Sequence, residues 1–462
     1  MKIPLPPFID SIGREIESAG GRLMLVGGSV RDALLGFGPG DLDFEVQGIP
    51  LQDLEMLLMA YGAVNQVGKA FGILKLTKAG ETFDFSLPRK EKKTGSGHRG
   101  FSVEIDPGLS FSEAAARRDF TVNAMGYDVA TKRLEDPFNG QIDLKARVLR
   151  HVGPAFIEDP LRGFRAMQLS ARFGLDIDNG TAALCRKLPI SELPKERIFE
   201  EFKKLLLKAE FPSRGFLAME NLGILSYFDE LSALRGVEQN PYWHPEGDVW
   251  THTLMVVDEM AAFRTGESAH DLLMMLAAVS HDLGKPSTTE LKAGNWTSHG
   301  HEDAGVPLTR SLIKKLTDQK DFINPLLALV REHLRPILLH QADQKQPVSD
   351  AVIRRLSMRV CIKDLVTLAR VDHFGRTTED AKHRVFEAGD WLAKRAQALN
   401  VWEKPPKPLI EGRDLLAIGF FPGPSIGRML KAVMDEQVEG HLKSRNDCLT
   451  WVQSQKRFKK LL

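Results

Sequence analysis

Residues 23–46, which read LMLVGGSVRDALLGFGPGDLDFEV, constrain the fold more than any other stretch of this chain. The apolar run 23–26 predicts a buried strand that ends at the glycine pair Gly27 and Gly28, and a short amphipathic helix is expected from Ser29. After a glycine-rich turn, residues 41–46 alternate strictly between acidic and apolar side chains. This alternation predicts a strand with three carboxylates on one face and three apolar side chains on the other.

The acidic face of that strand predicts a cation site. Acids are poor strand formers and repel one another, so Asp41, Asp43 and Glu45 on one face require a counter-charge. Two carboxylates two residues apart can hold one or two Mg²⁺ ions, which prefer oxygen ligands. The glycines, the helix N-terminus and the guanidinium of Arg31 suit phosphate oxygens. The pattern indicates a nucleoside triphosphate with metal, and a solvated acidic strand is the alternative.

Length and composition limit the classes of protein. A chain of 462 residues is too long for one ordinary core, so two to four domains are expected. The net charge is only +1, so any RNA contact must come from local clusters. Three cysteines lie far apart without a CxxC pair, which argues against disulfides and thiolate zinc sites. Neither a signal peptide nor an apolar run of about 20 residues is visible, so we expect a cytoplasmic protein with no membrane partner.

The segment that follows the first strands adds further candidates. Strands are predicted over 72–76 and 82–86, and Asp84 on the second is either a third carboxylate beside the acidic strand or a solvated edge residue. The basic, glycine-containing segment from Arg89 to 100 is predicted to be a loop. Ser110 and Glu113 fit a capping box that opens a helix predicted over 113–128.

Polar side chains also cluster on the two predicted helices that follow. Arg118, Asp119 and Asn123 fall within two turns of the first, where the last two are four residues apart. The second helix is predicted to begin at EDPLRGFR, with Pro160 in its first turn and with Asp159, Arg162 and Arg165 on one face. An aspartate beside an arginine can hydrogen-bond to the edge of a base, although a salt-bridged surface helix would look the same.

Histidines concentrate in the middle of the chain, where eight of the thirteen lie between His244 and His340. Imidazole and carboxylate groups suit a divalent metal, and the candidate ligands, spread over several predicted helices, are His252, His281, Asp282 and Asp372. Additional candidate ligands, although each is more often a surface or structural residue, are His299, His301 and His333.

The motifs GGSVRD, DLD, RRDFTVNA, EDPLR and HD, in this order, resemble the polymerase-β-like nucleotidyltransferases, in the class II branch of bacterial tRNA CCA-adding enzymes and poly(A) polymerases. The resemblance implies an α+β chain, with a mixed sheet and helices in the head and mostly helices after it. We expect a nucleotidyltransferase head over 1–150, a base-selecting helical neck over 151–235, an HD phosphohydrolase-like domain over 236–380 and a helical tail over 381–462.

The resemblance also implies roles for individual residues. Asp41 and Asp43 would be catalytic and bind Mg²⁺, and Asp159 with Arg162 would select C or A without a nucleic-acid template. Nucleotide contacts would be made by Gly28, Arg31, Arg118, Asp119, Asn123, Asp159, Arg162, Arg165 and Gln168. Several family members carry arginine where this chain has Gln168, which leaves the nucleotide preference open. The HD ligands would be His252, His281, Asp282 and Asp372, holding Ni²⁺, Mn²⁺ or Mg²⁺.

The implied reaction is template-independent addition of C and/or A to the 3′ end of tRNA from CTP and ATP, with release of pyrophosphate. The HD domain would add phosphatase or 2′,3′-cyclic phosphodiesterase activity. CC-only addition, A-only addition and poly(A) synthesis share these motifs and stay open. So does a different class, an HD phosphohydrolase with an RNA-binding head. The protein is expected to be a monomer or a homodimer.

Overall fold

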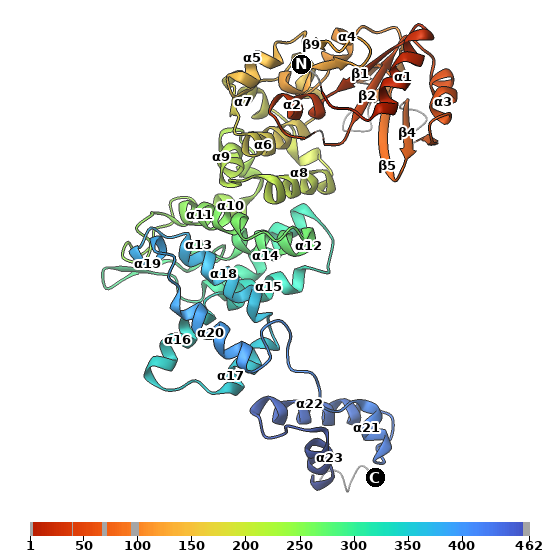
Figure 1. Cartoon of the computed structure of the whole chain (residues 1–462). Coiled ribbons are helices and arrows are strands. Elements are labelled where there is room, and N and C mark those ends of the chain that lie inside the picture. Colours follow the sequence, from red (N-terminus) through yellow and green to blue (C-terminus); the bar gives the residue numbers. More distant parts are fainter. Residues whose placement is uncertain (1–2, 39, 67–71, 94–100, 456–462) are drawn as a thin grey trace. The chain divides into compact units, whose positions relative to one another are not determined.

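The computed structural model describes residues 3–38, 40–66, 72–93 and 101–455, and the chain divides into two compact units, Met1–Phe228 and Asp229–Leu462. The first unit contains the large sheet and the helices that follow it, and the second is mostly helical (Figure 1). Within the described ranges, no helix has both the length and the hydropathy needed to cross a membrane.

The sheet of the first unit is mixed, with strand order β3-β4-β5-β2-β1-β8-β9. Its strands are β1 (Arg22–Val26), β2 (Asp43–Gln47), β3 (Ala63–Gln66), β4 (Ile73–Lys78), β5 (Glu81–Ser86), β8 (Gly126–Asp128) and β9 (Leu134–Glu135). β2 runs parallel to β5, and the other pairs are antiparallel. The apolar face predicted for β2 is buried, and Phe44 stacks on Phe85 of β5 with ring centroids 5.0 Å apart. Three helices of this unit are α1 (Pro7–Ser18), α2 (Gly28–Leu34) and α3 (Leu51–Met59).

Two predictions for the head are wrong in detail. Residues from Arg89 form strand β6 (Arg89–Lys93), which pairs with β7 (Phe101–Ile105) instead of starting a loop; residues 94–100 lie outside the described residues. A separate two-stranded ribbon does not need the apolar alternation on which strand prediction relies. The capping box at Ser110 and Glu113 is confirmed, but its helix α4 spans only Phe111–Ala115.

The chain after α4 leaves the predicted helix because one side chain and one distant backbone carbonyl accept its backbone N–H groups. The Asp119 carboxylate accepts from the backbone N–H of Phe120, and Thr121 donates its backbone N–H to the carbonyl of Arg150. Such bonds compete with the helical ladder. The segment forms a short 3₁₀ turn, η2 (Thr121–Asn123), and then strand β8.

The helices after the sheet are α6 (Leu161–Phe173), α7 (Asn179–Cys185), α8 (Lys195–Lys208) and α9 (Ser213–Asn221). α6 packs on both α8 and α9, around the buried rings of Phe164, Phe202 and Phe216. α6 begins after Asp159, which keeps an extended backbone with φ −117° and ψ 105°. A residue that precedes proline is disfavoured in the helical region, which explains why this helix starts later than predicted.

The second unit contains a helical body. Its central helices are α11 (Val249–Ala262), α12 (Ser268–Ser280), α13 (Lys285–Thr288), α14 (His301–Leu316), α15 (Ile323–Glu332) and α18 (Ile362–Phe374). α11 and α12 pack on each other and on α18. The other helices before the tail are α10 (Asp229–Ser232), α16 (Arg335–Lys345), α17 (Asp350–Ser357), α19 (Glu379–Lys382) and α20 (Glu387–Ala398).

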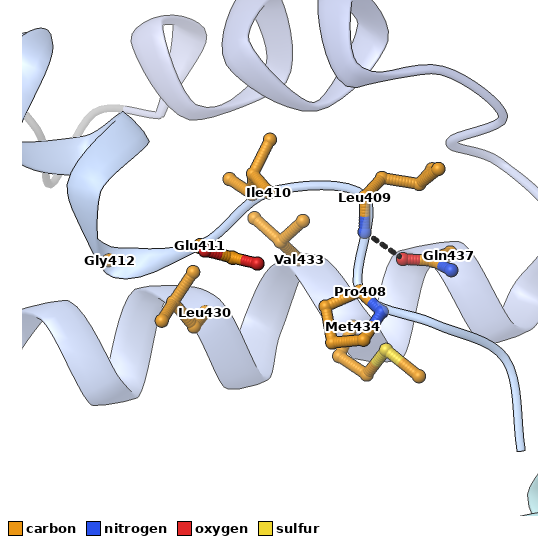
Figure 2. Close-up of a pocket in the computed structure, with 9 residues that line it drawn as sticks. All are labelled: Pro408, Leu409, Ile410, Glu411, Gly412, Leu430, Val433, Met434 and Gln437. Carbon is orange, nitrogen blue, oxygen red and sulfur yellow. Dashed lines mark hydrogen bonds between the residues drawn. The ribbon is translucent and has the colours of Figure 1, made fainter.

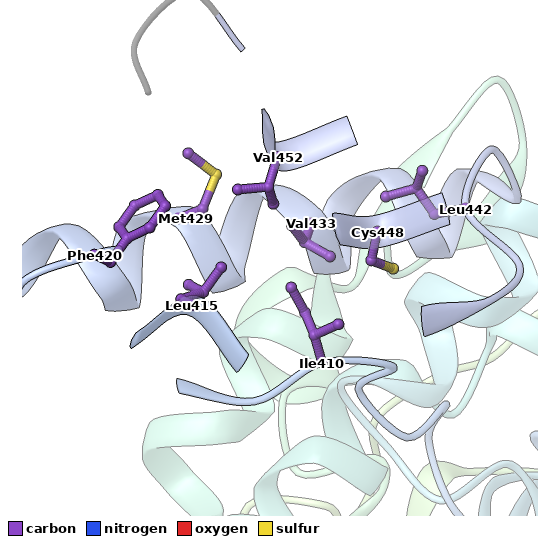
Figure 3. Packing of buried hydrophobic residues seen from close by; sticks show 8 residues of the cluster. All are labelled: Ile410, Leu415, Phe420, Met429, Val433, Leu442, Cys448 and Val452. Carbon is purple, nitrogen blue, oxygen red and sulfur yellow. The ribbon is translucent and has the colours of Figure 1, made fainter. Parts of the chain in front are cut away.

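The end of the second unit has a small core of its own. Helices α21 (Gly412–Ala417), α22 (Pro424–Glu439) and α23 (Arg445–Ser454) enclose apolar side chains that include Leu415, Val433 and Cys448 (Figure 3). The sequence predicts two short helices around a turn at residues 421–424, and α21 and α22 lie on the two sides of this turn, although α22 has 16 residues; α23 follows beyond the predicted pair. A pocket of about 270 Å³ lies between segment 408–412 and α22, where the Leu409 N–H donates to the Gln437 side chain over 3.2 Å (Figure 2).

Candidate functional site

Carboxylates from two neighbouring strands meet at one place in the sheet. Asp43 begins β2 and is the register partner of Asp84 on the parallel strand β5. Asp41 precedes the strand, and its backbone carbonyl accepts a 2.9 Å hydrogen bond from Ser29. Asp41 and Asp43 both reach solvent, as metal ligands for an incoming substrate must. Of the two alternatives for Asp84, the pairing of β5 with β2 favours a third carboxylate beside Asp43; the Asp84 side chain is also 3.3 Å from Lys75.

The electrostatics of this place favour a bound cation. Desolvation raises the pKa of Asp43, and the neighbouring carboxylates of Asp84 and Asp41 raise it further. A divalent ion among these oxygens would stabilise the charged forms, so the donor set fits Mg²⁺. Glu45, two residues further along β2, is buried and lies 3.5 Å from Arg118. Glu45 therefore positions an arginine, a role that alternation along a strand does not reveal.

The two glycines after β1 leave room for arginine side chains. A Cβ at Gly28 would lie 3.2 Å from the Arg31 guanidinium, and one at Gly27 would lie 3.2 Å from Arg118. Gly27 also has φ +76°, which other residues rarely adopt. The Arg31 guanidinium is buried, donates to Asn123 over 2.6 Å and lies 4.1 Å above the ring of Phe173.

A hydrogen-bonded chain joins α2 to α6 through Asp119. Asn123 bonds to Arg31 and donates to Asp119 over 3.0 Å, and Asp119 accepts from Arg165 over 2.6 Å. Burial opposes ionisation of Asp119, but the guanidinium of Arg165 and the bond from Asn123 outweigh it, so the pKa of Asp119 is lowered. Asp119 and Asn123 meet as predicted, although they do so across a turn and not on a helix face.

Asp159, Arg162 and Arg165 were predicted to share one helix face, but they do not, because Asp159 precedes α6. Its carboxylate pairs with Arg197 of α8 at 2.9 Å. Arg162 donates to the backbone carbonyls of Arg117 and Ala155 over 2.6 and 2.8 Å. Arg197 was not a sequence candidate, and its 38-residue separation from Asp159 gives no local signal.

Gln168 is buried on α6 and accepts a 3.0 Å hydrogen bond from Arg172. The guanidinium of Arg172 lies 4.9 Å from the centre of the Phe173 ring, and the guanidinium of Arg31 also contacts this ring. Gln168 therefore orients an arginine one turn further along the helix instead of supplying a charge itself.

The four HD candidates converge in the second unit. His252 comes from α11, His281 and Asp282 follow α12, and Asp372 lies on α18; all four side chains are buried. His252 Nε2 is 3.0 Å from the nearer oxygen of Asp372 and 4.0 Å from Oδ2 of Asp282. His281 Nε2 is 3.2 Å from the same Asp282 oxygen.

A second cluster uses the other oxygen of Asp282. Oδ1 lies 3.3 Å from His301 and 4.0 Å from His333, and both rings are buried. Both histidines are additional candidates from the sequence, and α14 and α15 bring their side chains to Asp282. His299 is exposed.

Burial and neighbouring charges shift the pKa values of these groups in different directions. Burial opposes protonation of His281, but the carboxylates of Asp282 and Asp372 outweigh it, so the pKa of His281 is raised, and a bound divalent ion would have to replace the proton on this ring. Burial lowers the pKa of His333 to about 3, which leaves its imidazole neutral. Burial opposes ionisation of Asp282, but His281 and Lys285 hold its pKa well below the ordinary value. Neutral imidazoles and ionised carboxylates are the forms that bind divalent ions. The groups His252–His281–Asp282 and Asp282–His301–His333 each place their ligand atoms within 4.8 Å of one another.

Further groups surround these ligands. Glu246 lies 2.8 Å from His252 Nδ1 and 2.9 Å from His244, and Lys285 pairs with Asp282 at 2.7 Å. Arg376 is 3.3 Å from Asp372. A carboxylate on Nδ1 keeps the proton there and leaves Nε2 free for a metal.

Comparison with known proteins identifies the family. The model of the poly A polymerase head domain matches residues 23–150, that of the "probable RNA and SrmB-binding site of polymerase A" matches 174–234, and that of the HD domain matches 249–374. The multifunctional CCA protein of Xanthomonas campestris pv. campestris (strain B100) is 36% identical over 426 residues, which cover 88% of this chain and 96% of that protein. The chain belongs to the multifunctional CCA protein family. The multifunctional CCA protein of Stenotrophomonas maltophilia (strain K279a) is 38% identical, over 72% of this chain and 80% of that protein.

Solved structures share the fold of this CCA protein family member. The Bacillus stearothermophilus CCA-adding enzyme in complex with CTP has a TM-score of 0.65 at 20% identity and covers 99% of both chains. The Thermotoga maritima CCA-adding enzyme complexed with tRNA has a TM-score of 0.57 at 18% identity, over 97% of this chain and 96% of that one. The predicted α+β class, with a mixed-sheet head and an HD domain further along, is confirmed.

Proposed function

We propose that this protein adds C and A nucleotides to the 3′ end of tRNA, using CTP and ATP and releasing pyrophosphate. One observation carries the proposal: Asp43 and Asp84 are register partners, and Asp41 comes two residues before Asp43, in a unit that also joins Arg31 to Arg165 through Asn123 and Asp119. Acidic oxygens for metal and arginines for phosphate are what nucleotidyl transfer requires. The names of the curated relatives support complete CCA addition over partial or poly(A) addition.

Each of these residues of the head would have a separate role in nucleotide addition. Asp41 and Asp43 would hold Mg²⁺, which supplies charge neutralisation and activates the RNA 3′-hydroxyl. The 3′-oxygen attacks the α-phosphorus as the bond to pyrophosphate breaks. Arg31, Arg118 and Arg165 offset the negative charge on the triphosphate, and the burial of Arg31 strengthens its effect.

Base choice is assigned to Asp159 and Arg162, as an acceptor and a donor. Arg197 fixes one carboxylate oxygen of Asp159, and two backbone carbonyls fix Arg162. A rigid pair can select a base edge without a template strand. Gln168 contributes by orienting Arg172.

The HD ligands His252, His281, Asp282 and Asp372, with His301 and His333, would hold one or two divalent ions. Such an ion lowers the pKa of water for attack on phosphorus, which suits phosphatase or 2′,3′-cyclic phosphodiesterase activity. Lys285 and Arg376 would balance phosphate charge nearby. We further propose the four domains 1–150, 151–235, 236–380 and 381–462, a cytoplasmic location and a monomer or homodimer.

The proposal is tested by incorporation on tRNA transcripts that end before CCA or after CC, and on an unrelated RNA, with CTP and ATP supplied separately. We expect two C residues and then one A on the first transcript, and a single A on the second. Growth of a long A tail on the unrelated RNA would overturn the tRNA-specific assignment.

The alternative function is an HD phosphohydrolase with an RNA-binding head. Removing the head carboxylates distinguishes this alternative from the proposed nucleotidyl transfer. Asp41→Ala with Asp43→Ala is expected to abolish incorporation, while Asp53→Ala, an exposed acid on α3, preserves it. If the double variant still incorporates nucleotides, the head is not the catalyst of incorporation.

A further inference from the structure

Two large aromatic side chains in the second unit are left in solvent. Tyr242 is 74% exposed and Trp243 is 54% exposed, although aromatic rings of this size are usually buried. The two rings are perpendicular, with centroids 4.6 Å apart. In such an arrangement the edge of one ring meets a face of the other, so this contact leaves most of the flat ring surface open.

The loop that carries these rings, residues 236–248, also belongs to the metal site. His244 is next to Trp243 in the chain, and its ring centroid lies 4.6 Å from that of His252. Glu246 contacts both His252 and His244. Gln239 accepts a 2.7 Å hydrogen bond from Lys285, the partner of Asp282. The exposed rings therefore stand on a segment that lines the HD ligands.

The 236–248 loop is held in one conformation by its own hydrogen bonds. Tyr242 and Trp243 donate their backbone N–H groups to the side chain and the carbonyl of Asn240, over 2.9 and 3.1 Å. Gln239 donates across the loop to the carbonyl of Gly247 over 3.1 Å. Glu246 also accepts from the backbone N–H of Thr377, just beyond α18. Rings presented on a fixed loop lose little conformational entropy when a ligand stacks on them.

We propose that Tyr242 and Trp243 form a stacking platform for the nucleobase of the substrate of the HD site. This rests on the phosphohydrolase activity proposed above and assigns to these two residues the recognition of the base that lies next to the reacting phosphate. Base–aromatic stacking tolerates every base, because each has a flat π-face. The metal held by the HD ligands, together with Lys285 and Arg376, would bind the phosphate, and the rings of Tyr242 and Trp243 would bind the base.

The test compares two substrates of the full-length protein in Mn²⁺: adenosine 2′,3′-cyclic phosphate and the base-free ribose 2′,3′-cyclic phosphate. Trp243→Ala is expected to raise KM for the adenosine substrate about 5- to 150-fold, the loss typical of one base stack, and to affect the base-free substrate far less. Trp243→Phe, which keeps a ring, should recover most of the loss. Phe421→Ala, which removes a 68% exposed ring in the tail, is the matched control and should match the unaltered protein.

Binding is measured without turnover by calorimetric titration of adenosine 2′,3′-cyclic phosphate into the full-length protein from which divalent metal has been removed with EDTA. The double variant Tyr242→Ala/Trp243→Ala should bind this compound more weakly than the unaltered protein. Equal affinity in the two proteins would overturn the platform proposal, even if both proteins hydrolyse the substrate when metal is present. A platform that binds without any hydrolysis would overturn the phosphohydrolase proposal alone. A changed sedimentation coefficient in Trp243→Ala, with unchanged KM, would instead assign the rings to contacts between copies of this chain.

Discussion

Asp119 shows how a single buried carboxylate connects distant parts of the first unit. It accepts from Asn123 and Arg165, and through Asn123 it is joined to Arg31. Because its native pKa is lowered, the ionised form stabilises the fold above the ordinary pKa, and this stabilisation is lost as the pH falls through the native pKa.

We therefore expect Asp119→Asn to lower the free energy of unfolding by about 1.5–3 kcal/mol at neutral pH, the range for hydrogen bonds to charged groups. The difference from the unaltered protein should stay constant above pH 5 or so and shrink below about pH 4. Urea unfolding at several pH values measures it. The control is Asp10→Asn, which removes an exposed partner of Lys132 and should cost about 0–1 kcal/mol. A difference that does not depend on pH would contradict the assignment.

Glu246 is the positioning residue for which the structure gives the clearest test. Because its carboxylate meets Nδ1 of His252, Glu246→Gln should weaken binding of Mn²⁺ about 10- to 100-fold, as expected when a histidine ligand loses its supporting carboxylate. Calorimetric metal titration measures this. Glu238→Gln, at an exposed position of the same loop, should bind Mn²⁺ like the unaltered protein. Unchanged affinity in Glu246→Gln would exclude the positioning role.

At the scale of elements, helix starts and ends depend on where side chains find partners. α4 stops early because Asp119 and Thr121 use backbone bonds outside a helix, and α6 starts late because Asp159 precedes a proline. Local patterns predicted that helices exist in these regions. The end of α4 depends on a contact with the flank of β10 (Val148–Leu149), which sequence spacing does not reveal, whereas the start of α6 follows from a proline that the sequence shows.

The three tail helices allow a test at this scale. Leu415 is fully buried among them, so Leu415→Ala should cost roughly 2–5 kcal/mol of local stability. Amide hydrogen exchange of α22 should then accelerate by more than about tenfold. Leu416→Ala changes a neighbour that is 44% exposed and should leave exchange unaltered. Equal exchange in both variants would show that this core does not hold α22.

At the scale of the whole molecule, the two proposed chemistries use residues of different compact units. Asp282→Asn should abolish metal-dependent phosphate release, because both ligand clusters share this carboxylate. Nucleotide incorporation should continue unchanged, as measured on the same protein preparation. Loss of both activities in this variant, with an intact circular dichroism spectrum, would contradict the two-site proposal. Asp303→Asn, an exposed acid on α14, serves as the control for phosphate release.

The sequence by itself predicted the fold class, the acidic strand and a group of four HD residues, because these follow from alternation along a strand, glycines after a strand and the order of the motifs. Only the tertiary structure decided which groups meet. It paired Asp43 with Asp84, Asp159 with Arg197, and Asp282 with His301 and His333. Those partners are separated by up to dozens of residues, and contacts of this kind depend on how strands and helices pack, which local periodicity does not encode.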